Sequence, residues 1–315
     1  MKFQCYEKNL KLKKEFKTSY KTTKSVEQVF VKLEFNNKVA SGSSLVCDKY
    51  TGKTPIEKMV DFLKYCEMEK REYKYIINNL YLLTDIPLSY KIATEIALWN
   101  IFHDVQIKTS IDENILLTSV SISLIDNDFL SDVDKYMRWP IIKFKISSLR
   151  DIEKIIAVRE IYNGRIWIDA NGAFNLREVE LLFEKLSHLN VEIIEQPLAK
   201  GEIYKLNKIN KFGIKLIADE DCTNQEDVYR LREYVDGVSL KIYKCKGLGN
   251  VQKMINISKD IGLSVMLSCK NESSLSIYPL LNFANKVDFL DLDGSLDILN
   301  DPFEAFKVKN GTILV

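Results

Sequence analysis

This 315-residue chain is poor in histidine, in clustered cysteines, in net charge and in long apolar runs. His103 and His188 are its two histidines, so we expect any general base to be a residue of another type. The six cysteines form no CxxC or CxH spacing, which argues against a zinc site. Scattered cysteines without an apolar leader favour a reducing cytoplasm, and no apolar stretch is long enough to span a bilayer.

The charged residues do not indicate a macromolecular partner. The chain has 45 basic and 44 acidic residues, well interspersed, with a net charge of +1. This balance argues against nucleic acid and against an anionic membrane as partners. The expected partner is therefore a small-molecule substrate. The sequence leaves the oligomeric state open, a homo-oligomer included.

From Thr118 onward, apolar runs that end in polar residues alternate with amphipathic segments of helical spacing, such as Asn175–Leu189 and Leu248–Ile261. The regular alternation favours an α/β fold with parallel strands closed into a barrel. An open doubly wound sheet is the alternative. The eight candidate strands are Ser119–Leu124, Pro140–Ile146, Arg165–Asp169, Val191–Glu195, Ile214–Asp219, Gly237–Tyr243, Leu263–Cys269 and Val287–Asp291.

Residues 1–110 follow a different pattern. Glu27–Phe35 and Val39–Val46 read as paired strands, and Ile56–Glu69 and Leu88–His103 read as helices. This part of the chain is therefore expected to be an α+β unit of its own. The tail after Asp297 shows no further barrel strand and is expected to pack back on that unit.

Three acidic residues, Asp169, Glu195 and Asp219, end three successive candidate strands at nearly even intervals. Each interval is as long as one strand plus one helix. Carboxylates at the carboxyl ends of successive parallel strands converge on one mouth of a barrel. Three carboxylates with no histidine or cysteine among them suit a hard divalent cation such as Mg²⁺. The sequence therefore predicts a metal-assisted reaction at this mouth.

The second candidate strand carries two lysines on one face. Alternation directs Lys143 and Lys145 into the barrel and Phe144 toward the helix layer. Mutual repulsion would lower the pKa of at least one lysine and make a neutral amine base accessible. The alternative is a pair of solvated lysines at a strand end.

The sixth candidate strand offers a third lysine, Lys241, on one face with Ser239 and Tyr243. Its strand lies across the barrel from the second strand, so Lys241 is expected to lie opposite Lys145. A substrate carbon held between the two would lose its α-proton to one lysine and gain a proton from the other. That exchange inverts a stereocentre.

The eighth candidate strand ends in two acids, Asp291 and Asp293, which share a face. They are either a receptor for a cationic group such as an α-ammonium or structural caps at the strand end. Asn171 and Glu220 are candidates to support the metal ligands from outside. Lys270, after the seventh strand, is a candidate substrate contact, although charged loop residues are often simply solvated.

Five short motifs follow one another at strand–helix intervals: Lys-x-Lys, Asp-Ala-Asn, Ile-Glu-Gln-Pro, Ala-Asp-Glu and Leu-Lys-Ile-x-Lys. The series resembles the enolase superfamily, in its muconate-lactonising-enzyme branch, over most of the chain. The resemblance implies a modified (β/α)7β barrel of the TIM type at residues 113–297. It also implies an α+β capping domain at residues 1–112 that is completed by residues 298–315.

The resemblance further implies roles for the site residues. One Mg²⁺ per site would be bound by the acidic triplet, and Lys143 would stabilise an enediolate. Lys145 and Lys241 would be the acid/base pair. Within the branch, the Asp-Leu-Asp-Gly ending of strand eight is similar to that of dipeptide epimerases such as L-Ala-D/L-Glu epimerase. There an acid pair binds the ammonium of the dipeptide, which assigns that role to Asp291 and Asp293.

The implied activity is that of an isomerase. It is a Mg²⁺-dependent dipeptide epimerase that inverts the α-carbon of the C-terminal residue by two-base 1,1-proton transfer through a metal-stabilised enediolate. The alternatives are other members of the branch (o-succinylbenzoate synthase, N-succinylamino acid racemase or a cycloisomerase) and a non-catalytic metal-binding protein. Lys270, in an atypical strand-seven ending, favours an acidic substrate group. The lysine-rich segment Glu15–Ser25 resembles in position the family's specificity loop.

Overall fold

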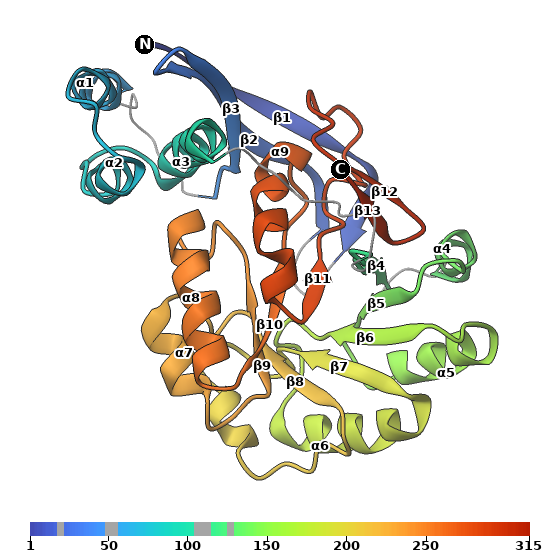
Figure 1. Cartoon of the computed structure of the whole chain (residues 1–315). Coiled ribbons are helices and arrows are strands. Elements are labelled where there is room, and N and C mark those ends of the chain that lie inside the picture. Colours follow the sequence, from blue (N-terminus) through green and yellow to red (C-terminus); the bar gives the residue numbers. More distant parts are fainter. Residues whose placement is uncertain (18–21, 48–55, 104–114, 125–128) are drawn as a thin grey trace.

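The computed structural model describes residues 1–17, 22–47, 56–103, 115–124 and 129–315. Its larger part is a barrel of parallel strands wrapped by helices (Figure 1). Neighbouring strands pair in chain order, and the two ends of the sheet meet where the Ser119 N–H donates to the Leu290 carbonyl at 3.1 Å. The strands are β4 (Val120–Ser123), β5 (Ile141–Lys145), β6 (Arg165–Asp169), β7 (Val191–Glu195), β8 (Lys215–Ala218), β9 (Gly237–Leu240), β10 (Ser264–Ser268) and β11 (Phe289–Asp291).

Some helices of the barrel begin at residues whose side chains cap them. Asn175 accepts from the Glu178 N–H at 3.1 Å and donates its own N–H to the Glu178 carboxylate at 2.9 Å, forming a capping box. Asn224 caps the next helix through the Asp227 N–H. The helices are α4 (Phe129–Lys135), α5 (Asp151–Ile161), α6 (Leu176–Leu186), α7 (Gln225–Leu231), α8 (Leu248–Asp260) and α9 (Ser274–Ile277).

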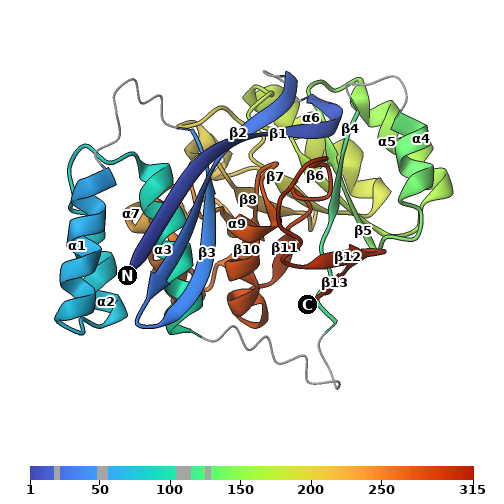
Figure 2. The ribbon, with the colours of Figure 1, turned by 90° about the horizontal axis from the view of Figure 1, so that it is seen from above.

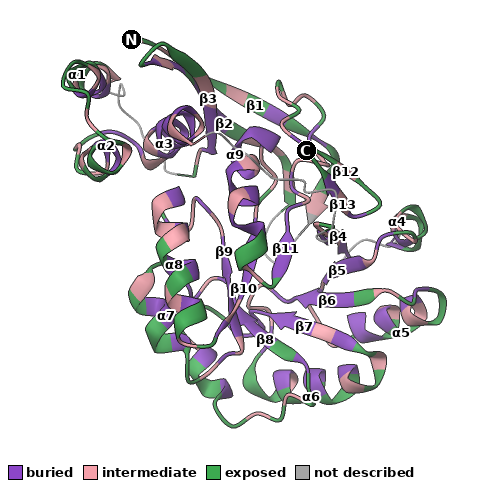
Figure 3. Cartoon of the chain, in the orientation of Figure 1, coloured by how far each residue is buried: buried purple, intermediate pink, exposed green. Residues whose placement is uncertain are grey.

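The barrel strands are buried on both faces, whereas the helices expose their outer faces to solvent (Figure 3). Phe144 packs outward in the core between strands and helices. Ile141 points inward and joins an apolar cluster with Trp167 and Phe289 that fills the barrel interior. Because side chains alternate along β5, Lys143 and Lys145 follow Ile141 on the inner face. The charged residues of β5 therefore lie above an apolar floor, toward the carboxyl ends of the strands.

The amino-terminal part is an antiparallel sheet of β1 (Lys2–Lys17), β2 (Thr22–Phe35) and β3 (Lys38–Leu45), with helices α1 (Ile56–Met68), α2 (Tyr73–Leu80) and α3 (Leu88–Phe102). Seen from above, this sheet lies across the barrel (Figure 2). Helix α3 is buried almost all round because it packs between the sheet and the barrel, which explains why its apolar residues are not confined to one face.

The carboxyl-terminal tail contacts both parts. Its backbone pairs with β1, where the Lys13 N–H donates to the Asp297 carbonyl at 2.7 Å and the Leu299 N–H to the Lys11 carbonyl at 2.8 Å. The tail then forms the hairpin β12 (Lys307–Lys309) and β13 (Thr312–Leu314). The expected return of the tail to the amino-terminal unit is thus seen at β1. The predicted boundary between residues 112 and 113 lies outside the described residues.

The barrel with its separate amino-terminal α+β unit confirms the predicted fold class and excludes the open sheet. The sequence analysis did not identify β1 and α2, and it extended the strand at Gly237–Tyr243 too far. Residues 15–17 and 22–25 belong to β1 and β2, and residues 18–21 lie outside the described part. Strand β9 ends at Leu240, so Lys241 and Tyr243 lie in a turn. None of the helices within the described ranges is long and apolar enough to cross a membrane.

Candidate active site

A cavity of about 1530 Å³ lies at the carboxyl ends of the barrel strands and is lined on its other side by residues of the amino-terminal sheet. Its floor is lined by the acids and lysines that the sequence analysis identified. Its upper wall includes apolar residues of the amino-terminal unit such as Val26, Leu45 and Tyr90. The cavity therefore lies between a charged floor and a partly apolar roof.

The three acids of the predicted metal site come from adjacent strands. Asp169 and Glu195 are register partners at the ends of β6 and β7, and Asp219 follows the end of β8. All three are buried. The Asp219 N–H donates to the Gln196 side-chain oxygen at 2.9 Å, which fixes the backbone there.

Lysines from opposite sides of the barrel reach this acid group. Lys145, on β5, donates to Asp169 at 2.6 Å, and Lys241, after β9, donates to Asp219 at 2.5 Å. Three strands lie between β5 and β9 in the sheet. In a barrel of eight strands this spacing places the two ammonium groups across the mouth from each other. Lys145 and its strand neighbour Lys143 are both largely buried, so the alternative of a pair of solvated lysines at the strand end is excluded.

Lys143 lies at the centre of the floor. It donates to Glu195 at 2.8 Å and to Asp291 at 2.6 Å, and it lies 3.6 Å from Asp169. Burial acts to lower the pKa of Lys143, but the three carboxylates raise it well above its ordinary value. Burial likewise acts to lower the pKa of Lys241, but Asp219 and Glu195 raise it. At both Lys143 and Lys241 the nearby carboxylates therefore outweigh burial and the repulsion between lysines.

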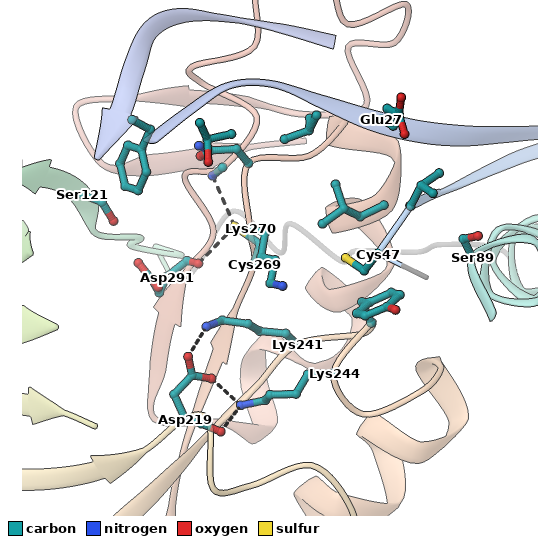
Figure 4. Close-up of a pocket in the computed structure, with 18 of the residues that line it drawn as sticks. Glu27, Cys47, Ser89, Ser121, Asp219, Lys241, Lys244, Cys269, Lys270 and Asp291 are labelled. Carbon is teal, nitrogen blue, oxygen red and sulfur yellow. Dashed lines mark hydrogen bonds and ion pairs between the residues drawn. The ribbon is translucent and has the colours of Figure 1, made fainter. Parts of the chain in front are cut away.

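Lys244 is a further lysine of the site to which sequence reasoning gave no role. It donates to the carboxylate of Asp219, to the Asp219 carbonyl at 2.6 Å and to the Ser239 carbonyl at 2.6 Å (Figure 4). Burial acts to raise the pKa of Asp219, but Lys241 and Lys244 lower it. The last residue of the Leu-Lys-Ile-x-Lys motif was the available signal for Lys244.

Asn171 and Glu220 lie beside the acid triplet. The Asn171 N–H donates to Asp169 at 3.1 Å, its side-chain oxygen accepts from Lys145 at 3.3 Å, and its amide donates to Glu220 at 3.3 Å. Among the described residues, Glu220 and Lys241 do not form an ion pair. Burial and the charge of Asp219 raise the pKa of Glu220 to about 7.

The two acids at the end of β11, Asp291 and Asp293, differ in their hydrogen bonds and in the direction of their pKa shifts. Asp291 is buried and accepts from Lys143, from the Ser119 hydroxyl and from the Ser268 hydroxyl, each at 2.6 Å. Burial acts to raise the pKa of Asp291, but these donors lower it to about 2.

Asp293 is half-buried and accepts from the Ser121 N–H at 2.6 Å. Burial and the charges of Asp291 and Asp297 raise the pKa of Asp293 to about 7. Asp293 is therefore the member of the pair with carboxylate oxygen left for a ligand.

Lys270 reaches the cavity from the segment after β10. Its ammonium lies 5.8 Å from the centre of the Tyr243 ring. Its backbone is fixed because its N–H donates to Glu272 at 3.1 Å. The neighbouring Cys269 thiol donates to the Asp291 carbonyl at 3.3 Å and accepts from the Gly294 N–H at 3.2 Å, which ties this segment to β11.

The acid triplet is chemically suited to a divalent cation. In the described residues, no three acidic, histidine or cysteine side chains are arranged as ligands of one metal ion. The carboxylates of the triplet instead accept hydrogen bonds from lysines. Glu195 nevertheless has one buried oxygen, Oε1, without a hydrogen-bond partner among the described residues. Burial raises the pKa of Glu195, and Asp169 and Asp219 add to this rise although Lys143 opposes it. A buried carboxylate oxygen without a donor, among other hard oxygen donors, fits Mg²⁺.

Comparisons with solved structures agree with the fold. A dipeptide epimerase from Enterococcus faecalis V583, solved with Mg and the dipeptide L-Leu-L-Tyr, superimposes with a TM-score of 0.85 over 99% of this chain and 95% of that one, at 20% identity. The L-Ala-D/L-Glu epimerase from Bacillus subtilis, in a substrate-liganded complex, gives 0.83 over 100% and 95%, also at 20% identity.

Sequence comparisons extend over nearly the whole chain. An L-Ala-D/L-amino acid epimerase of Flavobacterium johnsoniae is 26% identical over 99% of this chain and 96% of its own length. An L-Lys-D/L-Arg epimerase of Desulforapulum autotrophicum is 27% identical over 97% and 94%. The family model described as "Enolase C-terminal domain-like" matches residues 129–313, which is more than half of the chain. This match, on a barrel with the expected acids and lysines at its mouth, confirms the resemblance: the chain belongs to the enolase superfamily.

Proposed function

We propose that the protein is a Mg²⁺-dependent dipeptide epimerase that inverts the α-carbon of the C-terminal residue. The observation that carries this proposal is the placement of Lys145 and Lys241, which reach one group of carboxylates from opposite sides of the barrel. Two bases on opposite faces of one carbon are the arrangement that a stereochemical inversion requires. A single base would return the proton to the face from which it came.

The acid triplet, Asp169, Glu195 and Asp219, would hold the cation. The bound cation would hold the substrate carboxylate and draw electron density from the α-carbon, and its charge would offset the carboxylates that raise the pKa values of Lys143 and Lys241. Asn171 and Glu220 would support the triplet through the hydrogen bonds that link them.

The lysines would move the proton. With one stereoisomer, neutral Lys145 takes the α-proton and becomes an ammonium, while the Lys241 ammonium gives a proton to the opposite face. One C–H bond breaks and one forms, with no net redox change. With the other stereoisomer the two lysines exchange roles. Lys143, whose raised pKa keeps it protonated, would stabilise the negative charge that develops on the substrate carboxylate.

The end of β11 would bind the amino end of the dipeptide. Asp293 has a carboxylate oxygen available to accept from the ammonium. The oxygens of Asp291 are occupied, but its negative charge would still attract the ammonium. Lys270 would contact an acidic group of the substrate. The preferred side chains stay open, because the relatives named above differ in the dipeptides for which they are named.

The test is a screen of mixed dipeptides incubated with enzyme and Mg²⁺ in D₂O. Mass spectrometry should show one solvent deuterium at the C-terminal α-carbon, and chiral chromatography should show both epimers. N-acetylated versions of the responding dipeptides lack the ammonium and should react poorly. Absence of exchange in every dipeptide would overturn the proposal. Equal reaction of the acetylated forms would instead favour a branch member whose substrate has no free ammonium.

A further inference from the structure

The turn after β9 brings Lys244 back to the metal-site acids. Strand pairing ends at Leu240, and the chain then tightens, since the Cys245 N–H donates to the Lys241 carbonyl at 2.9 Å and the Gly247 N–H to the Ile242 carbonyl at 2.9 Å. The turn directs Lys241 and Lys244 to the same carboxylate, which they approach from different directions (Figure 4). Both side chains are about equally buried, with 12% and 13% of their surface exposed.

The two lysines use their protons differently. An ammonium has three N–H donors and no acceptor. Lys244 has three acceptors around it: Oδ1 of Asp219, the Asp219 carbonyl and the Ser239 carbonyl. Lys241 has one hydrogen-bond acceptor among the described residues, Oδ2 of Asp219. Lys244 is therefore saturated by the protein, whereas Lys241 keeps donors for a ligand.

The contacts of Lys244 fix Asp219 at two points. The carbonyl and Oδ1 of Asp219 are both held by Lys244, while its N–H is held by Gln196. The second carboxylate oxygen is left to Lys241. A cation that took this oxygen would release Lys241 and leave the Lys244 contacts intact.

We propose that Lys244 is a positioning residue that holds the side chain of Asp219 so that one oxygen faces the cation while Lys241 stays available for proton transfer. This inference rests on the proposed function, because it takes Asp219 as a metal ligand. Lys244 does not exchange protons with the substrate itself.

Positioning and charge have opposite effects on metal binding, so the sign of a mutational change distinguishes them. If Lys244 acts only as a nearby positive charge, its removal should strengthen Mg²⁺ binding. If it acts by positioning Asp219, its removal should weaken binding, and the loss of a residue that orients a metal ligand typically lowers affinity by about 10- to 100-fold.

The experiment is calorimetric titration of metal-free protein with Mg²⁺, without substrate. We expect Lys244→Met to raise the Kd for Mg²⁺ by about 10-fold or more. Lys244→Arg keeps the charge, but its planar group cannot donate to three acceptors from one nitrogen, so it should also weaken binding. The matched control is Lys246→Met, an exposed lysine two residues further along the same turn, whose Kd should not change.

Each outcome bears on a different claim. Wild-type affinity or tighter binding in Lys244→Met overturns the positioning role. Should that variant fail to fold, as judged by circular dichroism, Lys244→Arg with wild-type affinity overturns it instead. Asp219→Asn serves as the reference for the metal site. If the wild type and Asp219→Asn both fail to bind Mg²⁺, the proposed function is overturned, and this inference with it.

Discussion

Glu95 links the amino-terminal unit to the barrel, and its removal should destabilise the protein strongly. It lies on α3, is fully buried, and accepts three hydrogen bonds. Its donors are the Tyr81 hydroxyl at 2.6 Å and the N–H groups of Leu248 and Gly249 at 2.9 Å each. The two N–H groups belong to the first turn of α8, which directly follows the turn that carries Lys241 and Lys244. Glu95 therefore supplies, from another part of the fold, the acceptors for backbone N–H groups at the start of α8 that have no acceptor within the helix.

The magnitude follows from these three contacts. A buried donor left without an acceptor costs about 1–3 kcal/mol, and Glu95→Ala strips the acceptor from two backbone donors and one hydroxyl. Part of this loss is offset, because the buried carboxyl is itself unfavourable: burial raises the pKa of Glu95 although its donors act to lower it. We expect Glu95→Ala to lower the free energy of unfolding by about 3–5 kcal/mol. Glu95→Gln keeps one acceptor oxygen and should lower it by about 1–2 kcal/mol.

The assay is urea denaturation followed by circular dichroism, with the exposed Glu160→Ala as control, expected within about 0.5 kcal/mol of the wild type. The pH dependence adds a second test. A carboxyl whose pKa is raised by folding holds its proton longer in the folded state, so its contribution to stability falls as pH rises above the ordinary value of 4.5. The amide that replaces the carboxyl in Glu95→Gln does not titrate in this range. The stability of the wild type relative to Glu95→Gln should therefore decrease with rising pH. Wild-type stability in Glu95→Ala, or a difference that grows with pH, would refute this reasoning.

Three further predictions concern the reaction. Lys145→Ala and Lys241→Ala should each lower the rate of epimerisation by about 10²- to 10⁴-fold, as expected for loss of an acid/base residue. Each variant should still exchange the α-proton of one epimer with D₂O. Exchange of both epimers in either variant would contradict the two-base assignment. The apparent KM for a free dipeptide should fall as pH rises through about 7, because Asp293 then ionises, and Asp293→Asn should abolish this dependence. Mg²⁺ at about 100 times its Kd should stabilise the metal-free protein by about 2.7 kcal/mol in thermal unfolding, and Asp169→Asn should remove the effect.

The sequence predicted the barrel and its mouth because period and spacing are local properties. Alternation along β5 correctly placed Lys143 and Lys145 inside and Phe144 outside. The same rule failed after Leu240, where a turn held by backbone hydrogen bonds replaces the strand. Lys244 was missed for this reason, since a period of two assigns it to the wrong face of a strand that has already ended.

Other features depend on contacts between distant segments. Strand β1 is rich in lysine and lies at the edge of its sheet, where charged side chains are common and the apolar pattern is weak. The difference between Asp291 and Asp293 also has no local signal. The oxygens of Asp291 are occupied by donors from β5 and β10 and by Ser119, which directly precedes β4; no spacing within the strand-eight motif could show this.

The distribution of uncompensated charge indicates where the ligands of such a site would lie. Four lysines are each paired with carboxylates of the floor: Lys143, Lys145, Lys241 and Lys244. Among the described residues, Glu220 and Asp293 have no ion pair, and Glu195 keeps one buried oxygen without a partner. Glu195 ends β7 and Glu220 directly follows Asp219 after β8, whereas Asp293 follows the end of β11. Negative charge is thus left over at two separate places, and a carboxylate-bound cation and an ammonium group are the two positive charges that the proposed dipeptide complex would bring to them.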